Sequence, residues 1–452
     1  MTEPVIEDPD ATPAGPAPIA SAPRRSRPAP PRTLDEWLRW QSRLHPRGVD
    51  LGLARLSPVA RRLGLEHPPY RVVSVTGTNG KGSCVAYLEA GLAACGVRAG
   101  SYTSPPLGAL TECVRVAGVA CTESALVAAF ERVERARAGM PLTPFEFQTL
   151  AALDHLAHAG VEVAVLEVGM GGGRDAINVV AAEVVAITTV DVDHVDWLGA
   201  DRETIGAEKV ALVRPGASAV CGDSDPPRSV RDHLERVAAR SLWPGHGLEL
   251  EREATPWWVR WVGGSATGLP ELAMAGSHQR ANAACAIAAL GLLGCLGPTA
   301  PAGLGPALAA VRLPGRAERL AGPVERILDV AHNPQAARML AATLAARPVR
   351  GRTLAVLGMY ADKDVAGVVA PLVELVDRWF VCGLPPPRGL AGAALAARVR
   401  LQVPGEVVRC REPVSAYAAA MGAAEPGDRV VVMGSFATVG PVVERIAHER
   451  TT

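Results

Sequence analysis

The sequence predicts an α/β protein with two parallel β-sheets. Short runs of β-branched and other apolar residues alternate along the chain with helical patterns, which is typical of parallel strands joined by right-handed helical crossovers. The run Val161–Val168 is apolar almost throughout, as expected for a strand that is buried on both faces of a sheet. Nearly half of the 452 residues are hydrophobic, so the chain can bury a large core and wholesale disorder is excluded.

The first ordered element is expected at Thr33, a good N-cap residue before Leu34-Asp35-Glu36-Trp37-Leu38. Residues 1–32 are rich in Pro and Ala and show no periodicity, which predicts a disordered tail. Strands are predicted at Val72–Val75, Val161–Val168, Val184–Val190, Arg326–Val330, Thr353–Leu357, Trp379–Val381 and Arg429–Met433. Helices are predicted at Cys84–Cys95, Arg202–Val213 and Gln335–Ala345.

The chain is expected to divide near residue 313. The segment Gly297–Gly315 is rich in Gly and Pro and separates a long apolar helix from a new series of strands. That helix lies in Ala281–Gly297, the longest apolar stretch, which contains Asn282 and is too short to span a membrane. We therefore predict two domains, residues 33–312 and residues 313–452.

The composition excludes several classes of protein. Lys plus Arg and Asp plus Glu both number 46, and a zero formal charge without a basic block argues against nucleic-acid binding. Nine scattered cysteines without a C-x-x-C pair indicate reduced thiols rather than a disulfide framework. The acidic N-terminus has no apolar h-region, so we expect no secretory signal and no transit peptide, and we predict a cytoplasmic protein without membrane contact.

Only three of the 46 basic residues are lysines: Lys81, Lys209 and Lys363. A bias toward Arg in a chain rich in Ala, Gly and Pro is consistent with compositional drift. Positions that kept a lysine are then candidates for chemistry that a guanidinium cannot perform. The alternative is that three lysines survived by chance.

The strongest motif is Val75-Thr76-Gly77-Thr78-Asn79-Gly80-Lys81-Gly82-Ser83, between a predicted strand and a predicted helix. This is the context of a phosphate-binding loop, in which glycines let backbone N–H groups approach phosphate oxygens and the helix N-terminus and Lys81 supply positive charge. Ser83 can face a magnesium ion or a phosphate. The spacing is tighter than the common G-x-x-x-x-G-K-[ST] pattern, and the alternative is a Gly-rich turn with an exposed lysine.

Polar side chains also follow the neighbouring strands. Glu167 ends an apolar run, and a carboxylate at the end of a central strand is a usual ligand for the metal ion of a nucleotide. His194 follows the next predicted strand at the same edge of the sheet. The alternatives are a capping or solvated glutamate and a structural histidine.

Lys209 lies inside the predicted helix Arg202–Val213. A helical lysine is usually a solvated charge, but nearly all such residues of this chain are arginines. A desolvated primary amine can lose its proton and add carbon dioxide to form a carbamate, which a guanidinium cannot do. A carbamylated lysine is an anion that can position a magnesium ion.

Four polar segments of the second half are better explained singly by caps and turns. They are Gly276–Ala283, Leu313–Arg316, Leu328–Pro334 and Ala361–Asp364. Asp329 lies near a strand end, and Pro334 takes a suitable helix N1 position.

Taken together, the motifs resemble the folylpolyglutamate synthase/dihydrofolate synthase family of the Mur-ligase-like, ATP-dependent amide-bond ligases. The resemblance extends from about Leu34 to the C-terminus. It rests on Gly77–Ser83, Thr103-Ser104-Pro105, Phe145-Glu146-Phe147, Leu166-Glu167-Val168-Gly169, Asp193-His194 with Trp197-Leu198-Gly199, Glu208-Lys209, His278-Gln279, Asp329 with His332-Asn333-Pro334, Asp362-Lys363-Asp364 and Gly434-Ser435-Phe436. It implies a P-loop-containing parallel-sheet ATPase domain, followed by a smaller Rossmann-like α/β domain.

The resemblance also implies roles for individual residues. The residues that would hold ATP are Thr78, Asn79, Gly80, Lys81, Gly82, Ser83, Asn282, Arg316 and Asp329. Ser104, Glu167 and His194 match the magnesium ligands of the family, for which two ions are expected, and Lys209 matches its carbamylated lysine. Catalysis would be carried by Lys81, Lys209, His194 and Arg316.

A second group of residues matches the dihydropteroate side of bifunctional members. The matching residues are Asp50, Leu51, Gly52, Thr143, Pro144, Phe145, Glu146, Arg174, Asp175 and Ala176. Two positions depart from the pattern of the family: Pro106 replaces a usual His, and Arg174 is displaced by one position in a segment where Ile177 replaces a Thr. These departures affect the pteroate loop rather than the ATP chemistry.

The implied reaction is ATP-dependent addition of L-glutamate to dihydropteroate and to reduced folates through an acyl phosphate, in a monomeric enzyme. The alternatives are a glutamate-adding folylpolyglutamate synthase only, or another Mur-type ligase such as one that acts on a peptidoglycan precursor. A nucleotide-binding regulatory protein that has lost catalysis is the alternative from a different class, suggested by Pro106 and the shifted Arg174. Asp50-Leu51-Gly52 and Phe145-Glu146-Phe147 argue against the peptidoglycan ligase.

Overall fold

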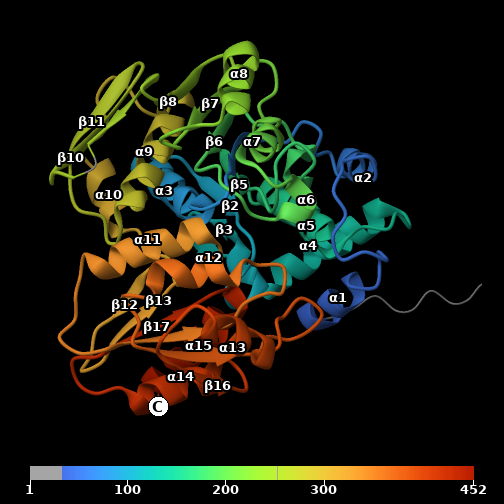
Figure 1. Cartoon of the computed structure of the whole chain (residues 1–452). Helices are drawn as coiled ribbons and strands as arrows, with labels where there is room; N and C mark the ends of the chain where they lie inside the picture. Colours follow the sequence, from blue (N-terminus) through green and yellow to red (C-terminus); the bar gives the residue numbers. More distant parts are fainter. Residues whose placement is uncertain (1–32, 252, 452) are drawn as a thin grey trace, which may run out of the picture.

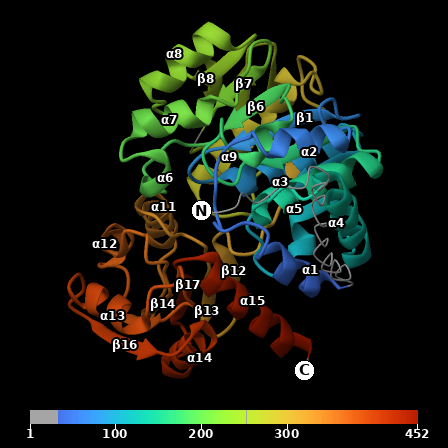
Figure 2. The ribbon, with the colours of Figure 1, turned by 90° about the vertical axis from the view of Figure 1, so that its right-hand side faces the viewer.

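The computed structural model describes residues 33–251 and 253–451, which form two lobes stacked one above the other in Figures 1 and 2. The larger lobe holds one β-sheet and the smaller lobe another. The predicted tail, residues 1–32, lies outside the described residues. The expected α/β class with two sheets is confirmed.

The larger lobe is built on a sheet that has eleven strands within the described residues. In spatial order they are β11 (Gly264–Leu269), β10 (Trp257–Trp261), β9 (Gly247–Leu250), β8 (Ser241–Pro244), β7 (Ser218–Cys221), β6 (Val184–Ile187), β1 (Arg71–Thr76), β5 (Val163–Glu167), β2 (Ala99–Tyr102), β3 (Val114–Val116) and β4 (Val119–Ala120). The centre, from β8 to β2, is parallel. Strand β1 lies between β6 and β5, so the loop that leaves its carboxyl end opens at a reversal of strand order, where ligands bind in open α/β sheets.

Side chains of the central strands alternate between two cores. Val72 joins one core and Val73 and Val75 join the other, because successive residues of a strand face opposite sides. The first face is covered by α1 (Leu34–Gln41), α2 (Leu56–Arg62), α4 (Glu123–Arg137), α5 (Pro144–His158), α7 (Arg202–Val210) and α8 (Arg228–Val237). The second face is covered by α3 (Lys81–Ala94), α9 (Ser277–Leu292) and α10 (Leu304–Ala310). Short helical turns are η1 (Leu110–Cys113), η2 (Ala176–Val179) and α6 (Val195–Leu198).

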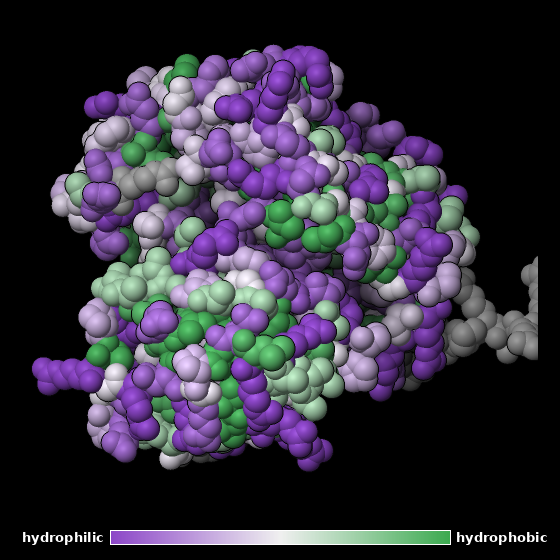
Figure 3. Space-filling view, in the orientation of Figure 1, coloured by the Kyte–Doolittle hydropathy of each residue, from purple (hydrophilic) through white to green (hydrophobic). Residues whose placement is uncertain are grey.

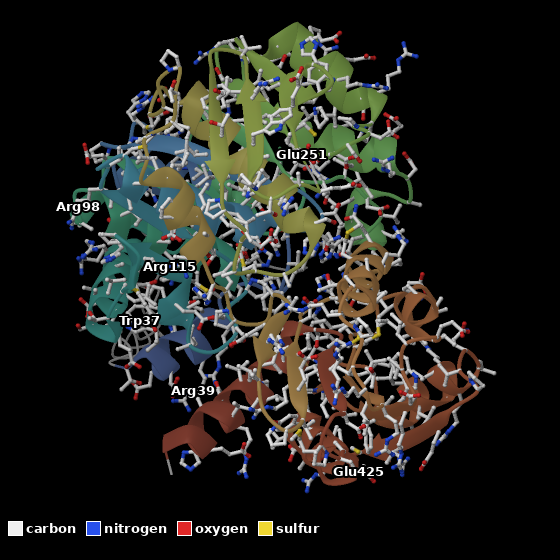
Figure 4. The ribbon with its side chains drawn as sticks, turned by 90° about the vertical axis from the view of Figure 1, so that its left-hand side faces the viewer. Trp37, Arg39, Arg98, Arg115, Glu251 and Glu425 are labelled. Atoms are coloured by element: carbon white, nitrogen blue, oxygen red, sulfur yellow. The ribbon has the colours of Figure 1, made fainter. Side chains whose placement is uncertain are left out.

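The N-terminal helix is fixed to the larger lobe by an aromatic cluster. Thr33 caps α1 in a capping box with Glu36, as the sequence predicts. Trp37 is fully buried and its ring lies 5.8 Å from that of Phe130 and 6.0 Å from that of Phe147. In Figure 4 the labelled Trp37 lies among the helices of this lobe, whereas Glu425 lies at the far end of the smaller lobe.

The smaller lobe has a sheet of six strands within the described residues. Their spatial order is β12 (Glu318–Leu320), β13 (Glu325–Leu328), β17 (Arg429–Met433), β14 (Thr353–Leu357), β15 (Arg378–Cys382) and β16 (Glu406–Cys410). Only β12 is antiparallel. One face packs on α11 (Pro334–Ala345), α12 (Val365–Val369), η3 (Ala370–Leu372) and α13 (Gly392–Arg400), and the other on α14 (Pro413–Ala423) and α15 (Phe436–Thr451).

The predicted elements are present and differ from the observed ones mainly at their ends, but further elements were not predicted. The strand predicted over Val184–Val190 ends at Ile187, and the helix predicted over Arg202–Val213 ends at Val210. Strands β2 to β4, β7 to β12 and β16 were missed. Among them, β3, β4 and β12 have only two or three residues, and β9 and β11 are half exposed and carry no continuous apolar run. The chain passes from the larger to the smaller lobe between α10 and β12, the segment that contains the predicted boundary near residue 313.

Within residues 33–251 and 253–451, no helix has both the length and the apolar character needed to cross a membrane.

Candidate active site

A cavity of about 1290 Å³ lies between the two lobes and is lined by both. Figure 3 shows the surface indented where the lobes meet. The predicted residues that line the cavity are Asp50, Leu51, Gly52, Thr78, Asn79, Gly80, Lys81, Gly82, Ser83, Ser104, Thr143, Phe145, Glu146, Glu167, Arg174, Asp175, Ala176, His194, Asn282, Arg316 and Asp329. Pro144 is the N1 residue of α5 beside this lining, and Lys209 lines a small adjoining cavity. The structure therefore places residues from the whole length of the chain around one space.

The phosphate-binding loop joins β1 to α3. Gly77 has a φ of +148°, and a Cβ atom there would lie 1.9 Å from Oγ1 of Thr188. Gly80 is the N-cap residue of α3 with a φ of +85°, in the left-handed region that favours glycine. Oγ1 of Thr78 donates to the carbonyl of Asp191 at 2.9 Å, which ties the loop to the segment after β6. The loop therefore presents its N–H groups at the start of a helix, where the helix dipole favours an anion.

Lys81 and Glu167 are the charged groups at the base of the loop. Nζ of Lys81 donates to the carbonyl of Gly77 at 3.1 Å and to that of Thr78 at 3.3 Å. Burial lowers the pKa of Lys81, and the charges of Glu167 and Asp193 oppose that shift. Burial also raises the pKa of Glu167, against which Lys81 and Arg316 act. The two residues therefore share one buried electrostatic environment beside the phosphate loop.

The expected magnesium ligands lie at the carboxyl ends of three parallel strands. Ser104 follows β2, Glu167 ends β5, and His194 comes after β6. The N–H of Ser104 donates to Oε2 of Glu167 at 3.2 Å, so these two residues are adjacent. Burial lowers the pKa of His194 to about 4, which leaves its ring neutral and able to bind a cation at neutral pH.

Among the described residues, no group of three or more His, Cys, Asp or Glu side chains is placed to hold a metal ion. The expected set offers only two such side chains together with a serine hydroxyl. This donor set fits a magnesium ion that takes its other oxygen ligands from nucleotide phosphates and water.

Lys209 is buried in α7 rather than solvated, with an exposed fraction of 3%. It lines a cavity of about 10 Å³ together with Lys81, Asp193 and His194. Burial and, to a smaller extent, the nearby charge of Lys81 lower the pKa of Lys209 to about 7. An amine with this pKa is largely neutral at slightly alkaline pH, as carbamate formation requires.

Arg316 and Asp329 enter the site from the smaller lobe. The guanidinium of Arg316 lies 5.1 Å from the ring centre of Phe436, and a methyl group added at Gly82 would lie 3.4 Å from its Nη2 atom. Asp329 accepts hydrogen bonds from the N–H groups of Ala317 and Ala331, both at 2.7 Å. Arg316 therefore reaches across the gap to the N-terminus of α3, beside the phosphate loop.

Direct contacts between the lobes surround the loop, and the sequence did not indicate them. Asn79 and Asn333 exchange side-chain hydrogen bonds of 3.1 and 3.0 Å. Asp193 forms an ion pair with Lys363, which is buried, and accepts a hydrogen bond from Asn333 at 2.9 Å. Lys363 and His332 hold the pKa of Asp193 well below its usual range, against the effect of burial. The motif around Asp193 was visible in the sequence, but its partners lie about 140 to 170 residues away.

The other end of the cavity is formed by the three expected dihydropteroate segments. Phe145 stacks near Tyr102, with ring centres 6.4 Å apart, and a Cβ atom on Gly169 would lie 2.5 Å from the Phe145 ring. The displaced Arg174 lines the cavity and forms an ion pair of 3.1 Å with Glu208. Burial raises the pKa of Asp175 to about 6.

The site also contains residues that sequence analysis left without a role. His278 lines the cavity close to Asn282, and burial lowers its pKa to about 4. Arg55 lies behind the dihydropteroate segments and binds two of them. The His278-Gln279 motif was the sequence feature that could have pointed to His278. For Arg55 the sequence offers no such feature, except that it lies close to Asp50-Leu51-Gly52.

The site combines a phosphate-binding loop, a buried carboxylate and an arginine from a second lobe. These features define the class of P-loop enzymes that hold ATP between two domains and transfer its phosphoryl group. Comparisons with known proteins agree with this class. The Mur ligase middle domain matches residues 75–290, and the Mur ligase glutamate ligase domain matches residues 315–436.

Individual relatives narrow the class. The chain is 39% identical to the dihydrofolate synthase/folylpolyglutamate synthase of Escherichia coli strain K12 over 92% of this chain and 96% of that protein. It is similar to the structure of E. coli FolC in complex with DHPP and ADP, with a TM-score of 0.87, 38% identity and coverage of 93% and 99% of the two chains. A Yersinia pestis folylpolyglutamate synthase/dihydrofolate synthase complexed with AMPPNP and Mn ion gives a TM-score of 0.84, 38% identity and coverage of 92% and 98%. The chain belongs to the dihydrofolate synthase/folylpolyglutamate synthase family of Mur ligases.

Proposed function

We propose that this protein adds L-glutamate to dihydropteroate and to reduced folates, with ATP as the source of energy. A carboxylate at neutral pH is a poor electrophile. Transfer of the γ-phosphoryl group of ATP to that carboxylate gives an acyl phosphate and ADP, and attack by the glutamate amine then forms the amide and releases phosphate. The observation that carries this proposal is that the phosphate loop, Arg316 and all three dihydropteroate segments line a single cavity.

The nucleotide end supplies positive charge around the transferred phosphoryl group. The N–H groups of Thr78–Ser83 and the ammonium of Lys81 hold the phosphates, and Arg316 approaches from the opposite lobe beside Gly82. Asp329 fixes the backbone of Ala317 next to Arg316. Asn282 and Asp329 complete the contacts with ATP at the two sides of the gap.

Ser104, Glu167 and His194 would hold magnesium ions, two in all, which supply positive charge to the phosphates when bound. We propose that Lys209 is carbamylated. Its burial, its low pKa and its place beside Lys81 and His194 support this modification, which converts a buried cation into an anion near the metal ligands.

The acid substrate lies at the other end of the cavity. Asp50, Leu51, Gly52, Thr143, Phe145, Glu146, Arg174, Asp175 and Ala176 surround that end, with Pro144 behind them. The ring of Phe145 offers an apolar face to a flat pterin or benzoyl ring.

The test is ADP release with dihydropteroate, and separately with a reduced folate, each with and without L-glutamate. Glutamate-dependent ADP release with both acids is expected. Release with the reduced folate alone would support a folylpolyglutamate synthase only. Nucleotide binding without glutamate-dependent release would support a regulatory protein, and activity only with muramyl precursors would support another Mur-type ligase.

We propose further that the protein acts as a monomer in the cytoplasm and that its two domains are residues 33–312 and 313–452. The position of the complete cavity within one chain supports the monomer, because no second copy is needed to line it. The separate hydrophobic cores of the two lobes support the domain division.

A further inference from the structure

We infer that Arg55 is a positioning residue that holds two dihydropteroate-binding segments against each other. It precedes α2 and lies behind the cavity lining, so it acts through the residues that it binds. Its Nε donates to Oε2 of Glu146 at 3.0 Å, and its Nη1 donates to Oδ2 of Asp50 at 2.7 Å. One guanidinium therefore joins a segment near the N-terminus to the start of α5, 91 residues further along the chain.

The contact between Arg55 and Glu146 is important because Glu146 is buried. Its side chain is only 3% exposed, and its carboxylate already accepts the N–H of Thr143 at 2.8 Å in the capping box of α5. The Nη2 atom of Arg55 lies 2.8 Å from the second carboxylate oxygen. Without Arg55, this buried carboxylate would lose the one ion pair that it makes within the described part of the chain, and an unpaired buried charge is destabilising. The capping box that presents Thr143 and Phe145 to the cavity would then be strained.

The contact with Asp50 fixes backbone as well as side chain. Nη2 of Arg55 donates to the main-chain carbonyl of Asp50 at 2.6 Å. On the other side, the N–H of Gly52 donates to the carbonyl of Arg174 at 2.9 Å. The segment Asp50–Gly52 is thus held at both ends, and through it all three dihydropteroate segments are connected. His45 and Arg47 also face Asp50, at 3.5 and 3.7 Å, but neither bridges to Glu146.

The geometry requires an arginine. The guanidinium uses three nitrogen atoms on acceptors that belong to two segments, which matches a planar fork of donors. A lysine ammonium would keep the charge but could not reach the same acceptors in fixed directions. Its single positive charge faces two carboxylates, and its fixed donors hold both in place, so Arg55 sets the shape of this end of the cavity.

This inference rests on the proposed function, and steady-state kinetics of three variants test it. Arg55→Met is expected to raise KM for dihydropteroate by about 10- to 100-fold, as for loss of charged hydrogen bonds, with kcat and KM for ATP within about twofold. Arg55→Lys should give an intermediate KM. The matched control is Arg132→Met, because Arg132 of α4 also pairs with a buried acid of α5, Asp154, at 2.6 Å, but away from the cavity.

The outcomes are distinct. An unchanged KM in Arg55→Met, or an equal rise in Arg132→Met, would overturn the positioning role. If Arg55→Met does not fold, the KM of Arg55→Lys decides: a rise supports the role, and a wild-type value overturns it. If the wild-type enzyme releases no ADP with dihydropteroate, the proposed function fails and this inference fails with it, whereas an active wild type with unaltered variants contradicts the inference alone.

Discussion

The two ends of the cavity are built in different ways. The nucleotide end is centred on one continuous stretch, Thr76–Ser83, to which the rest of the chain adds single residues: Ser104, Glu167, His194, Asn282, Arg316 and Asp329. The dihydropteroate end is assembled from Asp50–Gly52, Thr143–Glu146 and Arg174–Ala176, which meet only in the folded chain. Backbone conformation shapes the first end, and side-chain ion pairs hold the second together.

This difference predicts which kinetic constant a substitution at each end will change. A substitution at the nucleotide end should lower turnover with every acid substrate, because phosphoryl transfer is common to all of them. A substitution at the dihydropteroate end should change KM for the acid and leave the handling of ATP intact. The four predictions that follow test this separation, from the largest expected effect to the smallest.

Lys81→Met should cause the largest loss. Removing the ammonium from the phosphate loop takes away a preorganised charge, which costs about 10²–10³-fold in kcat at comparable sites. ADP release with dihydropteroate and with a reduced folate should fall together. The exposed Arg98→Met serves as the control, and a loss confined to one acid substrate would contradict a purely nucleotide-directed role.

Lys209→Arg should largely abolish turnover while the protein still folds, as checked by circular dichroism. A guanidinium cannot form a carbamate. In the wild type, ¹³C-labelled carbon dioxide should give an adduct signal above about pH 7, where the amine loses its proton, and the signal should fade as the pH drops below that value. Full activity of Lys209→Arg would remove the carbamate from the mechanism.

Gly169→Ala should act only at the dihydropteroate end. The new methyl group would lie 2.5 Å from the ring of Phe145 and would push that ring from its place. We expect KM for dihydropteroate to rise about tenfold, equivalent to loss of one good aromatic contact. Isothermal titration with an ATP analogue should give wild-type affinity, and weaker nucleotide binding would show that the two ends are not separable at this position.

Glu208→Gln should have the smallest effect. Its partner Arg174 is half exposed, and exposed ion pairs contribute little because water screens them. We expect KM for dihydropteroate to change by less than about fivefold, as for loss of at most 1 kcal/mol. A larger change would mean that Glu208 acts through its neighbour Lys209. In that case kcat with the reduced folate, measured in parallel, should also fall.

Local signals indicated the loop and the strand ends that line one part of the cavity. The loop Gly77–Ser83 needs its residue types at consecutive positions, and the cap at Thr33 and the buried strand around Val163–Glu167 likewise depend on near neighbours in sequence. The rarity of lysine singled out Lys209, but its burial could be seen only in the structure.

Long-range pairing was beyond the reach of sequence patterns. In the sequence Arg55 is one arginine among many. Its two acidic partners are brought to it only when α2 packs against the rest of the lobe. The exchange of hydrogen bonds between Asn79 and Asn333 joins residues that are 254 positions apart. The half-exposed strands β9 and β11 were missed because a strand with one face toward solvent needs no continuous apolar run.

The contacts that join the lobes carry a consequence for the timing of the reaction. Asn79, Asp193 and Lys363 all line the cavity, and each is engaged across the gap with a partner from the opposite lobe. Any separation of the lobes during nucleotide exchange would break these same contacts and withdraw Arg316 from Gly82. An open arrangement of the lobes would therefore lack both these contacts and the arginine beside the phosphate loop.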